Sequence, residues 1–259
     1  MTGASRGVGR GIAVALGQAG WIVYLTARSS ASGERTSHLP GTVEETAAAV
    51  TAAGGQGAGI VCDHRDDAAV AAVAARIQDE HGRLDLLVNN AWAGYERLNA
   101  GAYDEYIAPF WRQPLVLFDS MFSGGVRTHY VALATCGPLL ISTPGSLTVL
   151  VSNAIGDSGL EHTPVAYAAA KAADDQIALV AAAQLREHGV TSVAVYPDWV
   201  RTEGVMQFAD QVDLTGSQSP EGLGRAIAAL AADPDRLALS GRALRITDLA
   251  DRYGVDVSY

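Results

Sequence analysis

Short apolar segments alternate with long alanine-rich segments along this chain, and this alternation restricts the possible folds more than any other feature. The apolar runs are continuous, as in strands that are buried on both faces of a parallel sheet, and the alanine-rich stretches have helical spacing. We expect strands at residues 21–26, 59–62, 84–89, 147–151, 192–196 and 243–246, and helices at 9–19, 43–53, 67–81, 118–135, 165–188 and 221–232. This order predicts an α/β fold with a doubly wound parallel sheet, the Rossmann fold, formed by residues 1–259 as a single domain.

Charge, apolar runs and cysteines narrow the classes of function. The formal net charge is -10 at pH 7, so the chain has no general attraction for nucleic acid. The longest uninterrupted apolar run, residues 68–75, is far shorter than the roughly 18 residues needed to cross a membrane. Cys62 and Cys136 are too few for a disulfide framework, and no Cys/His spacing indicates a metal site. We therefore expect a cytoplasmic protein that binds no nucleic acid, membrane or metal.

A glycine-rich turn stands at the start of the first predicted helix. Its glycines, Gly3, Gly7 and Gly9, would let the backbone turn sharply and approach a pyrophosphate. The N-terminus of the helix would supply amide donors and a favourable dipole to that anion. The alternative for such a turn is an ordinary helix cap.

Tyr167 and Lys171 lie four residues apart in a predicted helix and therefore share one face of it. Lys171 is the only lysine of the chain, beside 17 arginines. An ammonium close to a phenol stabilises the phenolate, which makes the pair a candidate acid/base. The alternative is a tyrosine on a helix face beside a solvated lysine. Ser152 ends an apolar run at the carboxyl edge of the sheet, where a hydroxyl could face a substrate oxygen.

Taken together, these motifs resemble the short-chain dehydrogenase/reductase family over nearly the whole chain. The resemblance rests on the glycine-rich turn, Asn89-Asn90-Ala91 after a strand, a serine at the end of a strand, Tyr167-Ala-Ala-Ala-Lys171, and Pro197 followed by Thr202. Within the family, the chain is similar to the subgroup typified by dehydrogenase/reductase member 1. Matching segments are residues 39–46, 62–64, 126–130, 239–241 and 248–250, and an aromatic insertion that contains Phe110 and Trp111.

The resemblance implies hydride transfer between a nicotinamide and a carbonyl or alcohol carbon. Tyr167 would be the proton donor, Ser152 would hold the carbonyl oxygen, and Lys171 would bind the nicotinamide ribose. Asn153 directly follows Ser152, so a shift of the alignment by one residue is an open alternative. The cofactor-binding residues that the resemblance and the turn together indicate are Gly3, Ser5, Arg6, Gly7, Val8, Gly9, Arg28, Asp63, Asn90, Tyr167, Lys171, Pro197 and Thr202.

The charges near the second strand of the fold bear on the choice of cofactor. The run at 21–26 is followed by Arg28, the glycine-rich turn offers Arg6, and no carboxylate follows the strand before Glu34. A guanidinium suits a 2′-phosphate, whereas a 2′-hydroxyl favours an acidic partner. We therefore expect NADP rather than NAD, with solvated arginines as the alternative.

Aromatic residues indicate the class of substrate. Residues 92–122 hold eight of the 17 aromatic residues, and a predicted substrate loop at about 203–220 follows later. Aromatic side chains with few polar groups around a binding site favour a bulky apolar substrate, such as a ketone, an aldehyde or a ring alcohol. The alternative is an insertion that packs on itself or on another subunit of a homo-oligomer. The candidate substrate residues are Trp92, Trp111, Trp199 and Phe208, while His129 and His162 are expected to be surface or packing residues.

Three residues depart from the family pattern. Trp92 and Asp198 stand where glycine is usual, and Gly125 stands where the family has an asparagine that helps to hold a proton-relay water. Because these departures lie near the expected cofactor site, a catalytically silent nucleotide-binding or interaction protein of the same fold remains the alternative function.

The strand that normally precedes the glycine-rich turn is absent, since only Met1 comes before Thr2. That strand is central in a doubly wound sheet, and its loss leaves backbone groups of both neighbouring strands without partners. Each such buried group costs about 1–3 kcal/mol. We therefore expect that the natural chain carries more apolar residues before Thr2, and that these 259 residues fold poorly or bind nucleotide weakly.

Overall fold

Six parallel strands form the centre of a computed structural model that describes residues 1–33, 35, 37–156 and 160–259. The strands β1 and β2 pair with each other, and β3, β4, β5 and β6 follow one another in a second group. Every one of these pairings is parallel. The strands are β1 (Ile22–Ala27), β2 (Gln56–Val61), β3 (Leu86–Asn89), β4 (Leu147–Val151), β5 (Thr191–Tyr196) and β6 (Ala243–Arg245).

The first residues of the chain lie between the two groups of strands. Met1 O accepts a hydrogen bond from Thr26 N at 3.0 Å, and Thr2 N donates to Val88 O at 3.0 Å. Ala4 N donates to Thr26 O at 3.0 Å. The segment therefore satisfies part of the backbone of β1 and of β3, the two strands that the sequence predicted to lose their partners.

An apolar cavity of about 80 Å³ lies beside this N-terminal segment. Its walls include Met1, Val23, Leu87 and Cys136. The α-amino group of Met1 donates to Tyr24 O at 2.9 Å. Because burial disfavours the charged amine, its pKa is lowered from 8.0 to about 6.

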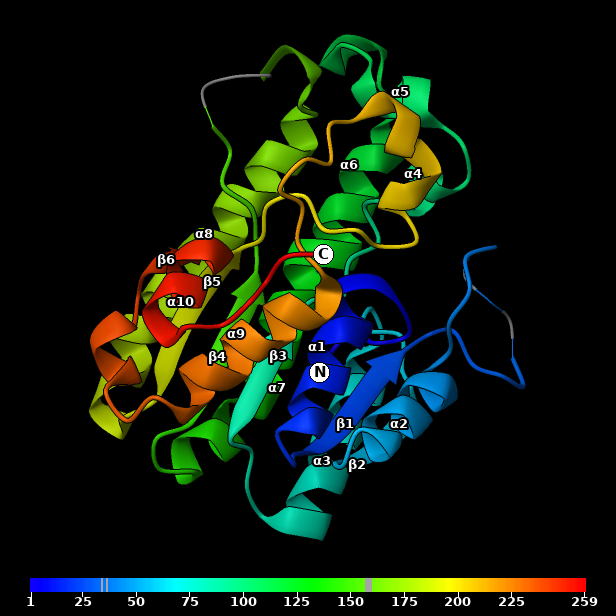
Figure 1. The fold of residues 1–259 in the computed structure, drawn as a ribbon. Coiled ribbons are helices and arrows are strands. Elements are labelled where there is room, and N and C mark those ends of the chain that lie inside the picture. The colour runs from blue at the N-terminus through cyan, green and yellow to red at the C-terminus, as the bar shows by residue number, and fades with distance from the viewer. Residues whose placement is uncertain (34, 36, 157–159) are drawn as a thin grey trace.

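Helices cover both faces of the strands, as Figure 1 shows. On β3, Leu86 and Val88 belong to the core cluster that contains Ile12 of the first helix, whereas Leu87 belongs to the cluster that contains Leu140 on the other face. This alternation is the doubly wound arrangement that the sequence predicted. The helices are α1 (Gly7–Gln18), α2 (Val43–Ala52), α3 (Asp67–His81), α4 (Glu96–Asn99), α5 (Tyr103–Ile107), α6 (Leu115–Met121), α7 (Arg127–Ser142), α8 (Val165–Leu185), α9 (Pro220–Ala232) and α10 (Ile246–Tyr253).

The helix predicted at 118–135 is interrupted. A π-helical turn at Phe122–Val126 separates α6 from α7. Gly124 and Gly125 lie in this turn. A Cβ at Gly124 would collide with Ala93, and a Cβ at Gly125 would collide with the ring of Trp92. The sequence pattern could not show these contacts, because they join segments far apart in the chain.

The predicted aromatic insertion, residues 92–122, contains α4, α5 and α6. The predicted substrate loop, residues 203–220, contains a 3₁₀ segment at Val205–Gln211. In Figure 1 this yellow-to-orange loop lies beside α4 and α5, and Phe208 contacts Tyr103 with ring centroids 5.2 Å apart. Among the described residues, no helix combines the length and the apolar character needed to span a membrane.

Candidate active site

A cleft of about 810 Å³ opens where β1, β3, β4 and β5 end. Doubly wound folds bind their ligands at this carboxyl edge of the sheet. The cleft brings together every catalytic and cofactor-binding residue that the sequence predicted: Gly3, Ser5, Arg6, Gly7, Val8, Gly9, Arg28, Asp63, Asn90, Ser152, Tyr167, Lys171, Pro197 and Thr202.

The glycine-rich turn forms one wall of the cleft. Gly3 and Gly7 have φ values of 65° and 54°, in the left-handed region that favours glycine. A Cβ at Gly9 would lie 2.2 Å from Gly3 O. The Gly7 N–H, at the start of α1, donates to the carboxylate of Glu203 at 2.9 Å. An anionic oxygen therefore already occupies the N-terminus of this helix, as a phosphate oxygen of a bound cofactor would.

The two arginines of the cofactor argument both have partners. Arg6 donates to Ser29 Oγ at 3.0 Å and to the carbonyl oxygens of Pro40 and Gly41 at 3.1 Å. Arg28 forms an ion pair with Glu96. The sequence argument considered only carboxylates close to Arg28 in the chain and therefore missed this one.

Glu34, the first carboxylate after β1 in the sequence, lies outside the described residues. Asp63 binds the guanidinium of Arg65, with Asp63 Oδ2 and Arg65 Nη2 2.7 Å apart, and this contact holds the pKa of Asp63 below its usual range. Asn90 donates to the carbonyl oxygens of Thr2 and Gly3, both at 3.1 Å. Asn90 thus fastens the end of β3 to the glycine-rich turn.

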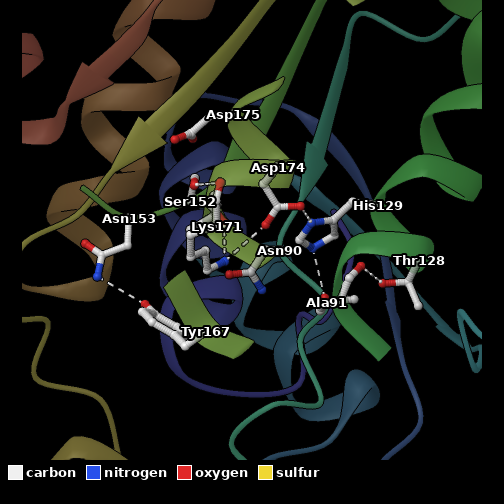
Figure 2. A network of polar contacts seen from close by, with 12 residues as sticks. Asn90, Ala91, Thr128, His129, Ser152, Asn153, Tyr167, Lys171, Asp174 and Asp175 are labelled. Atoms are coloured by element: carbon white, nitrogen blue, oxygen red, sulfur yellow. Dashed lines mark hydrogen bonds and ion pairs between the residues drawn. The ribbon is translucent and has the colours of Figure 1, made fainter. Parts of the chain in front are cut away.

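Tyr167 lies in the wall of the cleft, and its phenol is contacted by Asn153 rather than by Ser152 (Figure 2). Asn153 Nδ2 donates to the phenol oxygen at 3.1 Å. The hydroxyl of Ser152 instead donates to Lys171 O at 3.2 Å. The sequence analysis expected Ser152 to hold the substrate oxygen beside Tyr167. The structure instead places Asn153, the alternative that a shift of the alignment by one residue left open, next to the Tyr167 phenol. The physical reason is that consecutive side chains of an extended segment point to opposite sides.

Lys171 is buried and its ammonium is enclosed on several sides. Its Nζ donates to Val151 O at 3.1 Å and contacts a carboxylate oxygen of Asp174 at 3.3 Å. It also lies over the indole ring of Trp92, 4.1 Å from the ring centroid, which is a cation–π contact. The centroid of the Tyr167 ring is 6.0 Å from Nζ.

Two of the residues that depart from the family pattern, Trp92 and Gly125, pack against each other. A Cβ at Gly125 would lie 2.4 Å from the Trp92 ring. The indole therefore fills the space that a side chain at residue 125 would need. The third departure, Asp198, accepts from Gln218 Nε2 at 3.1 Å and pairs with Arg245 at 3.2 Å.

Aromatic side chains line the substrate end of the cleft. The ring of Trp92 contacts Tyr95 with centroids 6.0 Å apart, and Tyr95 contacts Tyr106 at 6.1 Å. Burial raises the pKa of both tyrosines, which keeps these phenols protonated. Trp199 and Phe208 also line the cleft.

Trp111, the remaining candidate for substrate binding, lies outside the described lining of the cleft. Its side chain is 70% exposed and packs edge-on against Phe110, with centroids 5.1 Å apart. The structure therefore corrects its placement. The reason is that Pro109 and Pro114 flank a short 3₁₀ turn, Phe110–Arg112, which carries both rings on the surface.

The sequence analysis missed two buried residues of the site. Asp174 contacts the ammonium of Lys171, and His129 contacts Asp174. Asp174 could have been noticed, because a residue three positions after Lys171 lies on the same face of α8. His129 was expected to be a packing or surface residue. It is buried as a packing residue would be, but it contacts Asp174 across two helices, which no local pattern shows.

Comparisons with known proteins agree with this architecture. A family model described as short chain dehydrogenase matches residues 1–213. The chain is 36% identical over 270 positions to Dehydrogenase/reductase SDR family member 1 of Mus musculus, and 33% identical over 269 positions to the protein of that name from Homo sapiens. Each alignment covers 98% of this chain and 81% of the relative.

A solved structure of a short chain dehydrogenase from Mycobacterium thermoresistibile superposes with a TM-score of 0.81 at 30% identity, covering 98% of this chain and 86% of that one. The resemblance inferred from the motifs is thereby confirmed. The chain belongs to the short-chain dehydrogenase/reductase family of oxidoreductases, whose members use nicotinamide cofactors.

Proposed function

We propose that this protein is an NADP(H)-dependent oxidoreductase that interconverts a bulky apolar ketone or aldehyde and its alcohol. The observation that carries the proposal is the phenol of Tyr167 in the cleft wall, bound by Asn153 at 3.1 Å and one helical turn from Lys171. In this proposal, residues 1–259 form one domain that binds the nucleotide.

The residues of the cleft fit a dinucleotide. The glycine-rich turn leaves no room for side chains at Gly3 and Gly9, and α1 begins there with an amide that already binds the carboxylate of Glu203. A pyrophosphate would be held at the same helix N-terminus. A bound nicotinamide supplies the hydride for the carbonyl carbon or accepts it from the alcohol.

The protein's own residues deliver the proton. Because Asn153 donates to the phenol oxygen, Tyr167 can donate its own phenol hydrogen to a substrate oxygen. Asn153 has a second amide hydrogen, which can bind the same substrate oxygen. The ammonium of Lys171 stabilises the phenolate that proton donation leaves behind. Burial of these groups in the cleft strengthens each of these interactions.

Arginine chemistry supports NADP(H) over NAD(H). Arg6 and Arg28 both line the cleft next to the end of β1, where a 2′-phosphate would lie. The carboxylate of Glu96 neutralises part of this charge through its ion pair with Arg28. A 2′-phosphate would replace that carboxylate as the partner of the guanidinium.

The aromatic walls support a bulky apolar substrate. The indole of Trp92 and the ring of Tyr95 both contact the Tyr167 ring, with centroids 5.9 Å and 6.0 Å away. A substrate carbonyl at Tyr167 would therefore lie between aromatic surfaces, which favour apolar ring systems.

The test is a fluorescence titration with NADPH and with NADH, on the wild type and on Arg28→Asp. We expect the wild type to bind NADPH more tightly. Arg28→Asp should weaken NADPH binding by about tenfold or more, with less effect on NADH, because it places a like charge beside the phosphate. Equal losses for both cofactors would contradict the role of Arg28. A wild type that binds NADPH but oxidises it with no member of an aldehyde and ketone panel would favour the catalytically silent alternative.

A further inference from the structure

The ammonium of Lys171 is the centre of a set of buried contacts. It meets Val151 O, the indole of Trp92 and Asp174 Oδ2, while the lysine itself is 6% exposed. An ammonium has three hydrogens to donate. Two oxygens and one aromatic face therefore fix its position at the wall of the cleft.

Asp174 uses both of its carboxylate oxygens. While Oδ2 faces Lys171, Oδ1 lies 2.8 Å from His129 Nδ1. Asp174 and His129 are 0% and 1% exposed, so water does not compete for these contacts. Burial alone would raise the pKa of Asp174, but the charges of His129 and Lys171 hold it below its usual range. The carboxylate is therefore ionised between two basic groups.

His129 connects this carboxylate to the loop that carries Trp92. Its second ring nitrogen, Nε2, lies 2.9 Å from Ala91 O (Figure 2). Carbonyl and carboxylate oxygens can only accept hydrogen bonds, so both ring nitrogens must carry hydrogens when Asp174 is ionised. His129 is then an imidazolium. Its two hydrogen bonds fasten the residue before Trp92 on one side and the carboxylate that holds Lys171 on the other.

We propose that Asp174 and His129 are positioning residues for Lys171. Asp174 holds the ammonium in place, and His129 fixes both Asp174 and the Trp92 loop against which the ammonium packs. The proposal rests on the proposed function in so far as Lys171 acts in the active site. Neither residue touches the substrate, and a change in either acts through the position of Lys171.

Because Lys171 is the only lysine, its position can be measured without an activity assay. Protein labelled with ¹³Cε-lysine gives one side-chain resonance by NMR. In the wild type we expect this resonance to be displaced by the ring current of Trp92, and Trp92→Leu should remove the displacement. Asp174→Asn and His129→Gln should each move the resonance toward the value of a free lysine. His129→Gln serves as the test if Asp174→Asn does not fold.

Thr128→Val is the matched control. Thr128 precedes His129, is 2% exposed and donates to Gly125 O at 2.7 Å, so the variant also loses a buried hydrogen bond. It should leave the Lys171 resonance unchanged. If His129→Gln and Asp174→Asn also leave it unchanged, the positioning role is wrong.

Turnover gives the second measurement. Asp174→Asn should lower kcat about tenfold or more with KM for the carbonyl changed by less than about threefold, because the substrate contacts remain. A change confined to KM would contradict the proposal. If the wild type reduces no carbonyl, the proposed function fails, while the Lys171 resonance still decides the positioning role.

Discussion

At the scale of single residues, the chemistry of the cleft depends on which of two neighbouring side chains reaches Tyr167. Asn153 makes that contact, and the hydroxyl of Ser152 binds the backbone of α8. The family motif indicated the segment that follows β4, but it could not indicate which of the two polar side chains there, Ser152 or Asn153, contacts Tyr167. That choice depends on where β4 ends, which is Val151.

Exchanging these two residues for alanine separates their roles. Asn153→Ala should lower kcat by about tenfold to a hundredfold, because it removes a donor from the reacting oxygen and from the phenol. Ser152→Ala should have the smaller effect, since its hydroxyl binds Lys171 O. Steady-state kinetics with NADPH and a ring ketone measure both. A larger loss in Ser152→Ala would restore the original assignment of the serine.

Other residues of the site could not be predicted from the sequence. Arg28 and Glu96 are 68 positions apart, and His129 and Asp174 are 45 apart. Such pairs depend on how helices and loops are placed over the sheet, which no local periodicity records. Tyr167, Lys171 and the glycine-rich turn could be predicted, because each lies within one element and has a short, regular spacing.

At the scale of elements, the apolar runs predicted the strands well, and β4 matches its predicted range of 147–151. Buried parallel strands are continuous in sequence, so their signal is local. The prediction of one helix at 118–135 was wrong, because a π-helical turn interrupts it where the chain packs against the loop that carries Trp92. Such turns arise from tertiary contacts and frequently lie at functional sites.

A pair of glycine variants tests this contact. Gly125→Ala should lower the free energy of unfolding by about 1–3 kcal/mol, because its Cβ would lie 2.4 Å from the Trp92 ring. Gly137→Ala is the control within α7. Apart from its chain neighbours and the backbone of the helix itself, a Cβ there meets no atom of the described chain within 4 Å. Since Pro138 follows it and crowds a Cβ at this position, the gain in helix propensity is offset and we expect a change of less than about 1 kcal/mol. Denaturant unfolding measures both. Equal stability of the two variants would contradict the packing of Trp92 on Gly125.

At the scale of the whole molecule, the two groups of strands are joined through Met1, Thr2 and Ala4. This short segment replaces part of the backbone pairing of a central strand, while an apolar cavity of about 80 Å³ remains beside it. The sequence predicted that the sheet lacks a central strand between β1 and β3. It could not predict that residues of the glycine-rich turn would bond to both flanking strands, because their conformation depends on those strands.

The buried amine of Met1 makes stability depend on pH. Its pKa of about 6 lies below the ordinary 8.0, so the unfolded chain binds the proton first as the pH falls. The free energy of unfolding should therefore increase by about 1.5 kcal/mol between pH 6.5 and 8. Burial lowers the pKa of His64 from 6.5 to about 4, so most of its effect lies below pH 6.5.

A variant with apolar residues placed before Met1 is the control, since an amide replaces the amine. Its stability should be flat over the same pH range. If the extended chain keeps the same pH dependence, another group is responsible and the buried amine is not the cause.

The central claim, that Tyr167 donates a proton during NADPH-dependent carbonyl reduction, is tested most directly by the turnover of Tyr167→Phe. The variant keeps the ring that packs against Trp92 and Tyr95 and removes only the phenol hydroxyl. With a bulky apolar ketone, and NADPH oxidation followed by absorbance, we expect turnover by the wild type and a kcat lower by orders of magnitude in the variant, at unchanged NADPH affinity. Turnover by Tyr167→Phe at a near-native rate would contradict the account.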